Sequence, residues 1–389
     1  MKPSRRTFLK YSGAIGVAAA ASDSGEASAR CKAIAEAADP TVKKLTGPHG
    51  EGLPVAIAGY DYNRVRALVE GAVTIHGCAH QFEVSGIGPM NNHTFFGPQT
   101  RAVTELGLIP YILAYANDDF RDYLLLPIPI LRLFRHQSIF IRTDRGIKTP
   151  ADLRGKTVAT VGYSSSGLTH VRGILQEEYG VSPKDINWIS TQKDSAINLT
   201  GGVSNWEKIR PEGVQIIDAE PDEDESSLLI SGKVDAILHP AEPKVFQDRN
   251  PIVVRLFTDH RSVEKDFYKR TGRFPIMHSV AIKREMAEQH PWLAKAVFEA
   301  YSKAKQLDYE YSQSLGWVME SLPWYGQEFE ETRELMGENF YPYGLQASAS
   351  SYETAIRYVY DQGLSKRKAG LEEMFEKSTL QLAETNDSR

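Results

Sequence analysis

The chain has 389 residues, of which 24% are charged and 41% are hydrophobic, and its formal net charge is −5. This is ordinary globular composition, long enough for two domains at roughly 100–200 residues each. The negative balance gives no reason to expect nucleic acid or an anionic membrane as a partner. Cys31 and Cys78 are the two cysteines. Because Cys31 lies near the start of the chain, we do not expect a disulfide framework.

The N-terminal segment differs from the rest of the chain. Arg5 and Arg6 precede Phe8-Leu9, a weakly hydrophobic stretch follows at 14–21, and Ala27-Ser28-Ala29 comes next. A basic start, a short apolar stretch and small residues at a cleavage point are typical of a secretory signal, and paired arginines are typical of the twin-arginine type. The alternative is a basic amphipathic start to a folded domain. We predict a signal at 1–29, cleaved after Ala29, with the twin-arginine translocase as export partner and the periplasm as destination.

The apolar stretch is far shorter than the roughly 20 residues needed to span a bilayer, so a permanent anchor is not expected. After it, apolar periodicity and turn residues predict alternating strands and helices. Two prolines make the apolar segment 124–130 an edge or crossover segment. The expected elements up to the middle of the chain are a strand at 53–60, a helix at 63–71, a strand at 72–84, a helix at 101–106 and a strand at 137–142.

The middle of the chain contains a βαβ pattern. A one-turn helix begins after Thr149, a buried strand covers 157–162, a helix covers 168–179 and a strand covers 187–190. This order favours a parallel sheet that binds ligand at the carboxyl ends of its strands. Beyond it we expect an acidic solvated loop at 218–225, a helix at 225–231, strands at 234–238, 253–257 and 279–282, helices at 284–290, 292–313 and 328–336, and a frayed tail at 376–389.

Several phrases together resemble the 4,5-dihydroxyphthalate decarboxylase-like proteins of the type II periplasmic-binding-protein superfamily. They run in order across nearly the whole chain after the signal. The matching stretches are 60–68, 134–140, 148–158, 255–257, 267–272, 274–278, 290–292 and 341–344.

The resemblance implies an α/β fold of two lobes, each a mixed sheet flanked by helices, joined by two hinge strands with the ligand between them. Lobe 1 would be discontinuous, covering 50–135 plus 275–375, and lobe 2 would cover 140–270. The crossings would lie near 135–142 and 274–282.

Three turns are expected to face the ligand cleft, because each follows a strand. Backbone N–H groups and hydroxyls at a helix N-terminus form an anion site, which suits a carboxylate. The alternative for Ser164, Ser165 and Ser166 is an ordinary N-cap and turn. The residues of the three turns are Tyr60 and Asp61, then Tyr163, Ser164, Ser165 and Ser166, and finally His239.

The hinge supplies three further candidates. Arg135 offers a bidentate fork for a carboxylate. His136 and His278 can hold a ligand or transfer a proton near neutral pH, so they are the catalytic candidates if the protein is an enzyme. A structural hydrogen bond in the hinge is the alternative for each histidine.

His76, Cys78 and His80 alternate along a predicted strand and could share a face as zinc ligands. A fourth ligand is not apparent, so we expect no metal and leave the role of these residues open. We also expect no cofactor, because no glycine-rich nucleotide fingerprint occurs. The lack of a nucleophile elbow argues against a hydrolase of that kind.

Two functions remain open from the sequence. The first is an exported solute-binding protein that closes on a small carboxylate, expected to be aromatic, and delivers it to a membrane transporter permease. The second, implied by the resemblance, is a cofactor-free decarboxylase that converts 4,5-dihydroxyphthalate to 3,4-dihydroxybenzoate and CO₂. The export signal favours the first, because a catabolic decarboxylase belongs with its cytoplasmic pathway.

Overall fold

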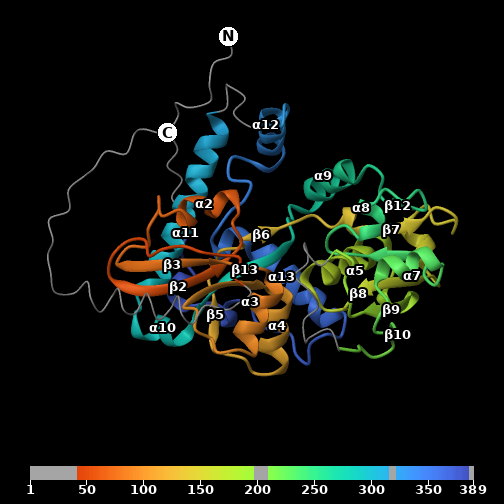
Figure 1. Cartoon of the computed structure of the whole chain (residues 1–389), viewed down its shortest axis with the longest axis horizontal. Helices are drawn as coiled ribbons and strands as arrows, with labels where there is room; N and C mark the ends of the chain where they lie inside the picture. Colours follow the sequence, from red (N-terminus) through yellow and green to blue (C-terminus); the bar gives the residue numbers. More distant parts are fainter. Residues whose placement is uncertain (1–41, 197–208, 315–320, 385–389) are drawn as a thin grey trace, which may run out of the picture.

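The computed structural model describes residues 42–196, 209–314 and 321–384. In these residues the chain forms two mixed β-sheets, each flanked by helices and set side by side (Figure 1). We call the first sheet with its helices lobe 1, and the second sheet with its helices lobe 2. The expected two-lobed α/β fold is confirmed.

The sheet of lobe 1 has the strand order β1-β3-β2-β4-β13-β5, and β6 also pairs with β13. β2 runs parallel to β3 and β4, whereas β13 runs antiparallel to β4, β5 and β6. The strands are β1 (Lys44–Leu45), β2 (Leu53–Gly59), β3 (Cys78–Val84), β4 (Val103–Gly107), β5 (Tyr123–Leu125), β6 (Leu131–Arg132) and β13 (Ile276–Lys283).

The sheet of lobe 2 has the order β10-β9-β8-β11-β7-β12. The first four strands are parallel, as the βαβ pattern predicts, and β7 runs antiparallel to β11 and β12. The strands are β7 (Ile139–Arg142), β8 (Thr157–Val161), β9 (Asn187–Thr191), β10 (Ile216–Asp218), β11 (Ala236–Leu238) and β12 (Val253–Arg255).

The helices cover both sheets. None of those in the described ranges is long and apolar enough to cross a membrane. They are α2 (Asn63–Val69), α3 (Ile87–Phe95), α4 (Leu108–Asn117), α5 (Ser166–Tyr179), α7 (Glu225–Ser231), α8 (Lys244–Gln247), α9 (His260–Thr271), α10 (Arg284–Gln289), α11 (Leu293–Gln313), α12 (Tyr325–Met336) and α13 (Leu345–Asp361), with short 3-10 helices at 136–138, 150–153, 183–185, 372–374 and 377–379.

The chain crosses between the sheets twice, from β6 to β7 and from β12 through α9 to β13 (Figure 1). One hydrophobic core continues across this boundary. It includes Leu106 and Ile109 of lobe 1 together with Val158 and Leu168 of lobe 2. The two lobes are therefore packed against each other.

A glycine allows two helices to approach closely at this boundary. Gly173 lies on α5, and a Cβ at this position would be 2.3 Å from a ring carbon of Tyr358 on α13. The His170 ring, one turn earlier, also packs edge-on against the Tyr358 ring. The helices α5 and α13 can therefore come this close only because residue 173 is a glycine and has no side chain.

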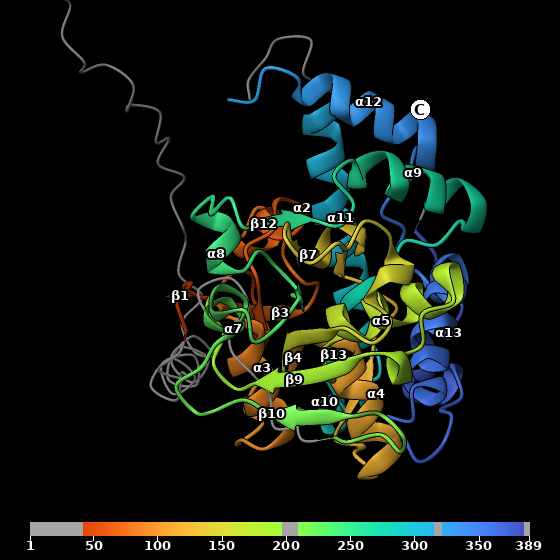
Figure 2. The same ribbon diagram turned by 90° about the vertical axis from the view of Figure 1, so that its right-hand side faces the viewer.

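Charged side chains tie the lobes together at two places. Glu177 on α5 accepts hydrogen bonds from Arg273 before β13, at 2.8 Å, and from Arg357 and Tyr358 on α13. The second place is the contact of α9 with α12, which Figure 2 shows one above the other. There Arg261 pairs with Glu328 at 2.7 Å.

Besides the strand expected at 72–84, which begins only at Cys78, two expectations differ from the structure. Residues 101–106, expected as a helix, lead into and form the buried strand β4, where Val103 and Thr104 pair with β2 and β13. The expected frayed tail is packed up to residue 384, because Glu384 accepts a hydrogen bond of 2.6 Å from Lys305 on α11. Both differences come from contacts with residues far away in the sequence, which the local sequence pattern does not reveal.

We predict that Gly173→Ala lowers the free energy of unfolding by about 1–3 kcal/mol, the usual cost of overpacking. The new methyl group would overlap the Tyr358 ring. Urea unfolding at neutral pH measures the change. Gly326→Ala on α12 is the control, because no atom lies within 4 Å of its Cβ position. It should be neutral or stabilising by up to about 1 kcal/mol. Equal stability of Gly173→Ala and wild type would contradict the close contact.

We also predict an acid-sensitive contribution from Glu177. Burial opposes its ionisation, but hydrogen bonds from Arg273, Tyr358 and Arg357 outweigh burial and lower its pKa to about 2. At pH values between the usual glutamate pKa and about 2, the native state therefore binds fewer protons than the unfolded state. The free energy of unfolding consequently decreases as the pH is lowered through that window. Glu177→Gln should lose less stability than wild type between pH values of about 5 and 2.5 in urea titrations. The exposed Glu353→Gln should behave like wild type.

Candidate functional site

A histidine and a glutamate meet at the edge of lobe 1 where β2 and β4 end. Tyr60 directly follows β2, Glu105 lies in β4 and His278 lies near the start of β13. His278 Nδ1 is 2.6 Å from Glu105 Oε1. The Glu105 side chain is 2% exposed and that of His278 is 12% exposed, so the pair lies just below the surface.

Strand register brings these side chains together. β13 is antiparallel to β4 with Val280 opposite Glu105, so His278 is the diagonal neighbour of Glu105 on the same face. Two further donors reach the carboxylate. The Tyr60 backbone N–H donates to Oε2 at 3.0 Å, and the Tyr62 hydroxyl donates to Oε1 at 2.7 Å. The carboxylate is thus held by partners from two segments, the connection at 60–62 and β13.

Tyr60 forms an aromatic wall beside His278. The two rings stack with centroids 6.0 Å apart and an interplanar angle of 18°. The Tyr60 hydroxyl accepts a hydrogen bond of 2.8 Å from the Ile87 N–H at the start of α3. Burial raises the pKa of Tyr60 to about 12, so the phenol is neutral at physiological pH. The neighbouring Asp61 is exposed.

Arg135 lies between the lobes. Its Nε donates to Met277 Sδ at 3.0 Å on β13, and its Nη1 donates to the Pro240 carbonyl at 2.6 Å in lobe 2. The guanidinium also lies against Gly167 in the first turn of α5, where an added Cβ would be 3.1 Å from Cζ. Burial lowers the pKa of Arg135 to about 10, so the side chain is still a cation at neutral pH.

The serine turn sits beside this arginine. Ser165 is the N-cap of α5 and accepts a hydrogen bond from the Leu168 N–H at 3.3 Å. Ser166 accepts a hydrogen bond of 3.1 Å from the Ile109 N–H in the first turn of α4, which belongs to lobe 1. The N-terminus of α5 therefore lies against Arg135, and the N-terminus of α4 is hydrogen-bonded to the same turn. Positive helix ends and a guanidinium form an environment that favours an anion.

The remaining turn residues lie deeper in lobe 2. Tyr163 is fully buried, with the Arg172 guanidinium 3.7 Å from its ring centroid and Trp188 packed edge-on against it. Ser164 is also fully buried. Contrary to the expectation of a turn residue that faces the cleft, Tyr163 lies in the core of lobe 2 and not beside Tyr60 and His278.

His239 belongs to a buried group with Asp194 and Glu225, whose potential ligand atoms lie within 4.8 Å of one another. His239 Nδ1 accepts a hydrogen bond from the Ala241 N–H at 3.0 Å, and Nε2 is 3.0 Å from Asp194 Oδ1. An imidazole whose Nδ1 accepts must carry its proton on Nε2. A metal-binding histidine instead donates from its second nitrogen. The hydrogen bonding therefore fits a structural network better than a metal centre.

His136 is enclosed by aromatic rings. Its ring centroid is 5.5 Å from that of Phe257 and 5.3 Å from that of Phe267. Both ring nitrogens are buried, and neither has a hydrogen-bond partner among the described residues. Burial lowers the pKa of His136 to about 4. Against the expectation of a ligand-facing or catalytic group, this histidine is a neutral side chain in the hinge core.

The histidines and cysteine around β3 do not gather as metal ligands. His76 is exposed, whereas Cys78 is fully buried and burial raises its pKa to about 12. His80 Nε2 lies 3.1 Å from the Leu68 carbonyl. Within the ranges that the structure covers, the one group of three possible ligands is that of His239.

Comparison with known proteins identifies the family to which the chain belongs. A 4,5-dihydroxyphthalate decarboxylase of Comamonas testosteroni is 31% identical over 335 residues, which cover 85% of this chain and 98% of that protein. The protein of the same name from Pseudomonas putida is 31% identical over 220 residues, covering 56% of this chain and 82% of that protein. The chain belongs to the 4,5-dihydroxyphthalate decarboxylase family.

Two family models also match parts of the chain. The model described as NMT1/THI5 like matches residues 130–209, and the model of the TAT (twin-arginine translocation) pathway signal sequence matches residues 2–22. The second match confirms the export signal, so the protein is directed to the periplasm through the twin-arginine translocase. The expected cleavage after Ala29 lies outside the described residues.

Solved structures similar to this chain include binding proteins and an enzyme. The periplasmic aliphatic sulphonate binding protein SsuA from Escherichia coli has a TM-score of 0.49 and 17% identity, covering 85% of this chain and 99% of that chain. The desulfurization enzyme DSZB has a TM-score of 0.45 and 14% identity, covering 84% of this chain and 97% of that chain.

Several residues at this site were not among the candidates expected from the sequence. Glu105 was expected on a helix, and its signal would have been an acidic residue inside an apolar stretch that ends at Gly107. Tyr62 was not singled out. Arg64 was also missed, although its guanidinium carbon lies 4.1 Å from the Tyr62 ring centroid and 4.5 Å from that of Tyr341.

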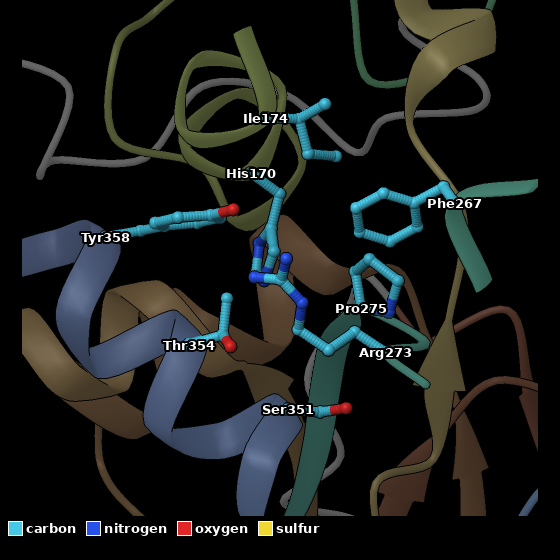
Figure 3. A pocket seen from close by; sticks show the side chains of 8 residues that line it. All are labelled: His170, Ile174, Phe267, Arg273, Pro275, Ser351, Thr354 and Tyr358. Carbon is cyan, nitrogen blue, oxygen red and sulfur yellow. The ribbon is translucent and has the colours of Figure 1, made fainter. Parts of the chain in front are cut away.

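A small hollow lies apart from these residues, at the hinge (Figure 3). Figure 3 shows His170 of α5 and Tyr358 of α13 facing Arg273 and Pro275 of the return crossing. His170 Nδ1 is 2.8 Å from the Ser166 carbonyl. None of the site residues expected from the sequence lines the hollow. It belongs to the contact between the lobes.

We predict that His136→Phe makes the protein less sensitive to mild acid. The pKa of His136 lies below that of an unfolded histidine, so the unfolded state gains a proton first as pH falls from about 6.5 to 4 and the native state loses stability. A phenyl ring fits the aromatic surroundings and removes this loss. Urea unfolding across that window tests it, with the exposed His76→Phe as control. An unchanged pH dependence of His136→Phe would contradict the burial of a neutral ring.

Proposed function

We propose that this exported protein binds a small aromatic carboxylate between its two lobes. The observation that carries the proposal is the environment of Arg135. Its side chain is buried at the lobe boundary, and no carboxylate in the described part of the chain lies within ion-pair distance of it. A carbonyl and a thioether are neutral partners. The carboxylate that acts on the charge, Glu264 on α9, lies beyond ion-pair distance, and burial raises its own pKa to about 7, so the buried charge is only partly compensated. An anionic ligand would supply the missing charge.

The surroundings of Arg135 favour a carboxylate as that anion. The first turn of α5 lies against the guanidinium, and the first turn of α4 is tied to it through Ser166. A guanidinium can bind both carboxylate oxygens, and helix N-termini add backbone donors. Because these groups come from both lobes, a bound carboxylate would hold the lobes together, as in closure around a ligand.

Lobe 1 offers the surface proposed for the aromatic part of the ligand. Tyr60 and His278 present stacked, flat rings at the end of the same sheet, and β13 carries both His278 and the Arg135 contact Met277. Flat rings favour offset stacking with another ring. The relatives' names point to hydroxylated aromatic acids of the same chemistry. We propose that a membrane transporter receives the bound acid.

The contact between Glu105 and His278 favours a second candidate function, decarboxylation of a hydroxylated aromatic acid. A protonated His278 would transfer its Nε2 proton to the ring carbon that carries the carboxylate. The C–C bond would then break, its electron pair would return to the ring and CO₂ would leave. Neutral His278 would recover its proton from water. A positioned general acid of this kind contributes about 10²–10⁴-fold to a rate.

The experiment incubates the exported protein with phthalate and 4,5-dihydroxyphthalate and follows thermal stability and CO₂ release together. Dimethyl phthalate, which lacks the carboxylates, is the matched control ligand. The proposal expects stabilisation by the acids and none by the ester. No stabilisation by any acid would contradict binding, whereas CO₂ release that His278→Ala abolishes would establish the second candidate.

Arg135→Gln tests the proposed anion partner. Loss of charge-assisted hydrogen bonds worth about 1.5–3 kcal/mol should weaken binding by about 10- to 100-fold. Isothermal titration with the acid that stabilises the protein measures this change. The matched control is Arg154→Gln, which removes an exposed arginine of lobe 2 that pairs with Asp185 and should leave affinity unchanged. Equal affinities of the Arg135→Gln and wild-type proteins would place the carboxylate elsewhere.

A further inference from the structure

We infer that Glu105 is a positioning residue that keeps the proton of His278 on Nδ1 and thereby presents Nε2 to the ligand. This inference rests on the proposed site and adds to it the atom that meets the ligand. Neither the family resemblance nor the comparisons assign a role to Glu105.

The hydrogen bonds around Glu105 give the direction of the contact. Its carboxylate accepts from the Tyr60 N–H and from the Tyr62 hydroxyl, both at bonding distance. An ionised carboxylate has only acceptor atoms, so the ring nitrogen 2.6 Å from Oε1 must be the donor. His278 Nδ1 therefore carries a hydrogen whether the ring is neutral or protonated.

The opposite nitrogen is the one left for a ligand. Nε2 of His278 has no hydrogen-bond partner among the described residues, and the side chain is 12% exposed. The neutral ring offers Nε2 as an acceptor for a phenol or carboxylic acid hydroxyl, and the protonated ring offers it as a donor to a carboxylate. The same atom would donate the proton in the decarboxylation candidate.

The backbone around Glu105 leaves little freedom for another arrangement. Gly59 lies beside Glu105, and a Cβ there would be 3.4 Å from Oε2 and 3.0 Å from the Phe82 ring. The Tyr60 N–H follows directly, so the strand end itself holds one carboxylate oxygen. The second oxygen is shared between Tyr62 and His278. Glu105 is consequently fixed before any ligand arrives.

The test measures the His278 tautomer directly, without ligand, by long-range ¹H–¹⁵N NMR of protein labelled at histidine. His278→Gln identifies the signals by their loss. The inference expects the Nδ1–H tautomer as the majority form of neutral His278 in wild type, and loss of that majority in Glu105→Gln, whose amide can donate to Nδ1. Tyr60→Phe is the matched control, because it keeps the backbone donor and the stacked ring, and its tautomer should match wild type.

Two outcomes would overturn the inference. One is a wild-type spectrum in which neutral His278 carries its proton on Nε2, a result that needs no variant and so does not depend on the folding of Glu105→Gln. The other is an unchanged tautomer in a folded Glu105→Gln protein. Failure of the acids to bind would contradict the proposed function and leave the tautomer result intact, so the two failures are distinguishable.

Discussion

Burial of the Arg135 charge at the boundary between the lobes is the constraint on which the rest of the site depends. The guanidinium is removed from water by the packing of two sheets that share one core, and its described partners are a carbonyl and a sulfur. Desolvation of this kind is costly unless an opposite charge approaches. Glu264 on α9 acts on this charge from beyond ion-pair distance, and the proposed ligand carboxylate would add a direct ion pair.

The two lobes contribute differently to the proposed site. Lobe 1 offers rigid polar groups, since Glu105 and His278 lie on adjacent strands and the Tyr60 N–H follows a third. Lobe 2 offers a helix end, since α5 begins at the serine turn. His239 lies behind this helix end in a hydrogen-bonded network with Asp194.

Much of the fold could be predicted from the sequence, because the elements of lobe 2 follow local rules. The cap at Thr149, the strand from Thr157 and the helix ended by Gly180 are all present. The helix expected at 101–106 was wrong, since burial between β2 and β13 decides the conformation there. Local periodicity carries no information about partners that lie far away in the sequence.

The site was harder to predict than the fold for the same reason. Position after a strand selected Tyr60, whose ring stacks on that of His278, but it also selected Tyr163, whose ring packs in the core against Arg172. His136 and His278 looked alike in the sequence, and only packing separates a ring among phenylalanines from one bound to a carboxylate. Glu105 meets His278 through the register of β4 against β13, which cannot be read from either segment alone.

The place of β13 has a consequence for the order of events in the life of the chain. This strand is paired on both sides within the first sheet, with β4 on one side and β5 and β6 on the other, yet it is synthesised after the whole second sheet. The first sheet is therefore incomplete on the ribosome until residue 283 has emerged, and its final assembly follows translation. A pathway that exports proteins after folding matches a chain whose first lobe is the last to be completed.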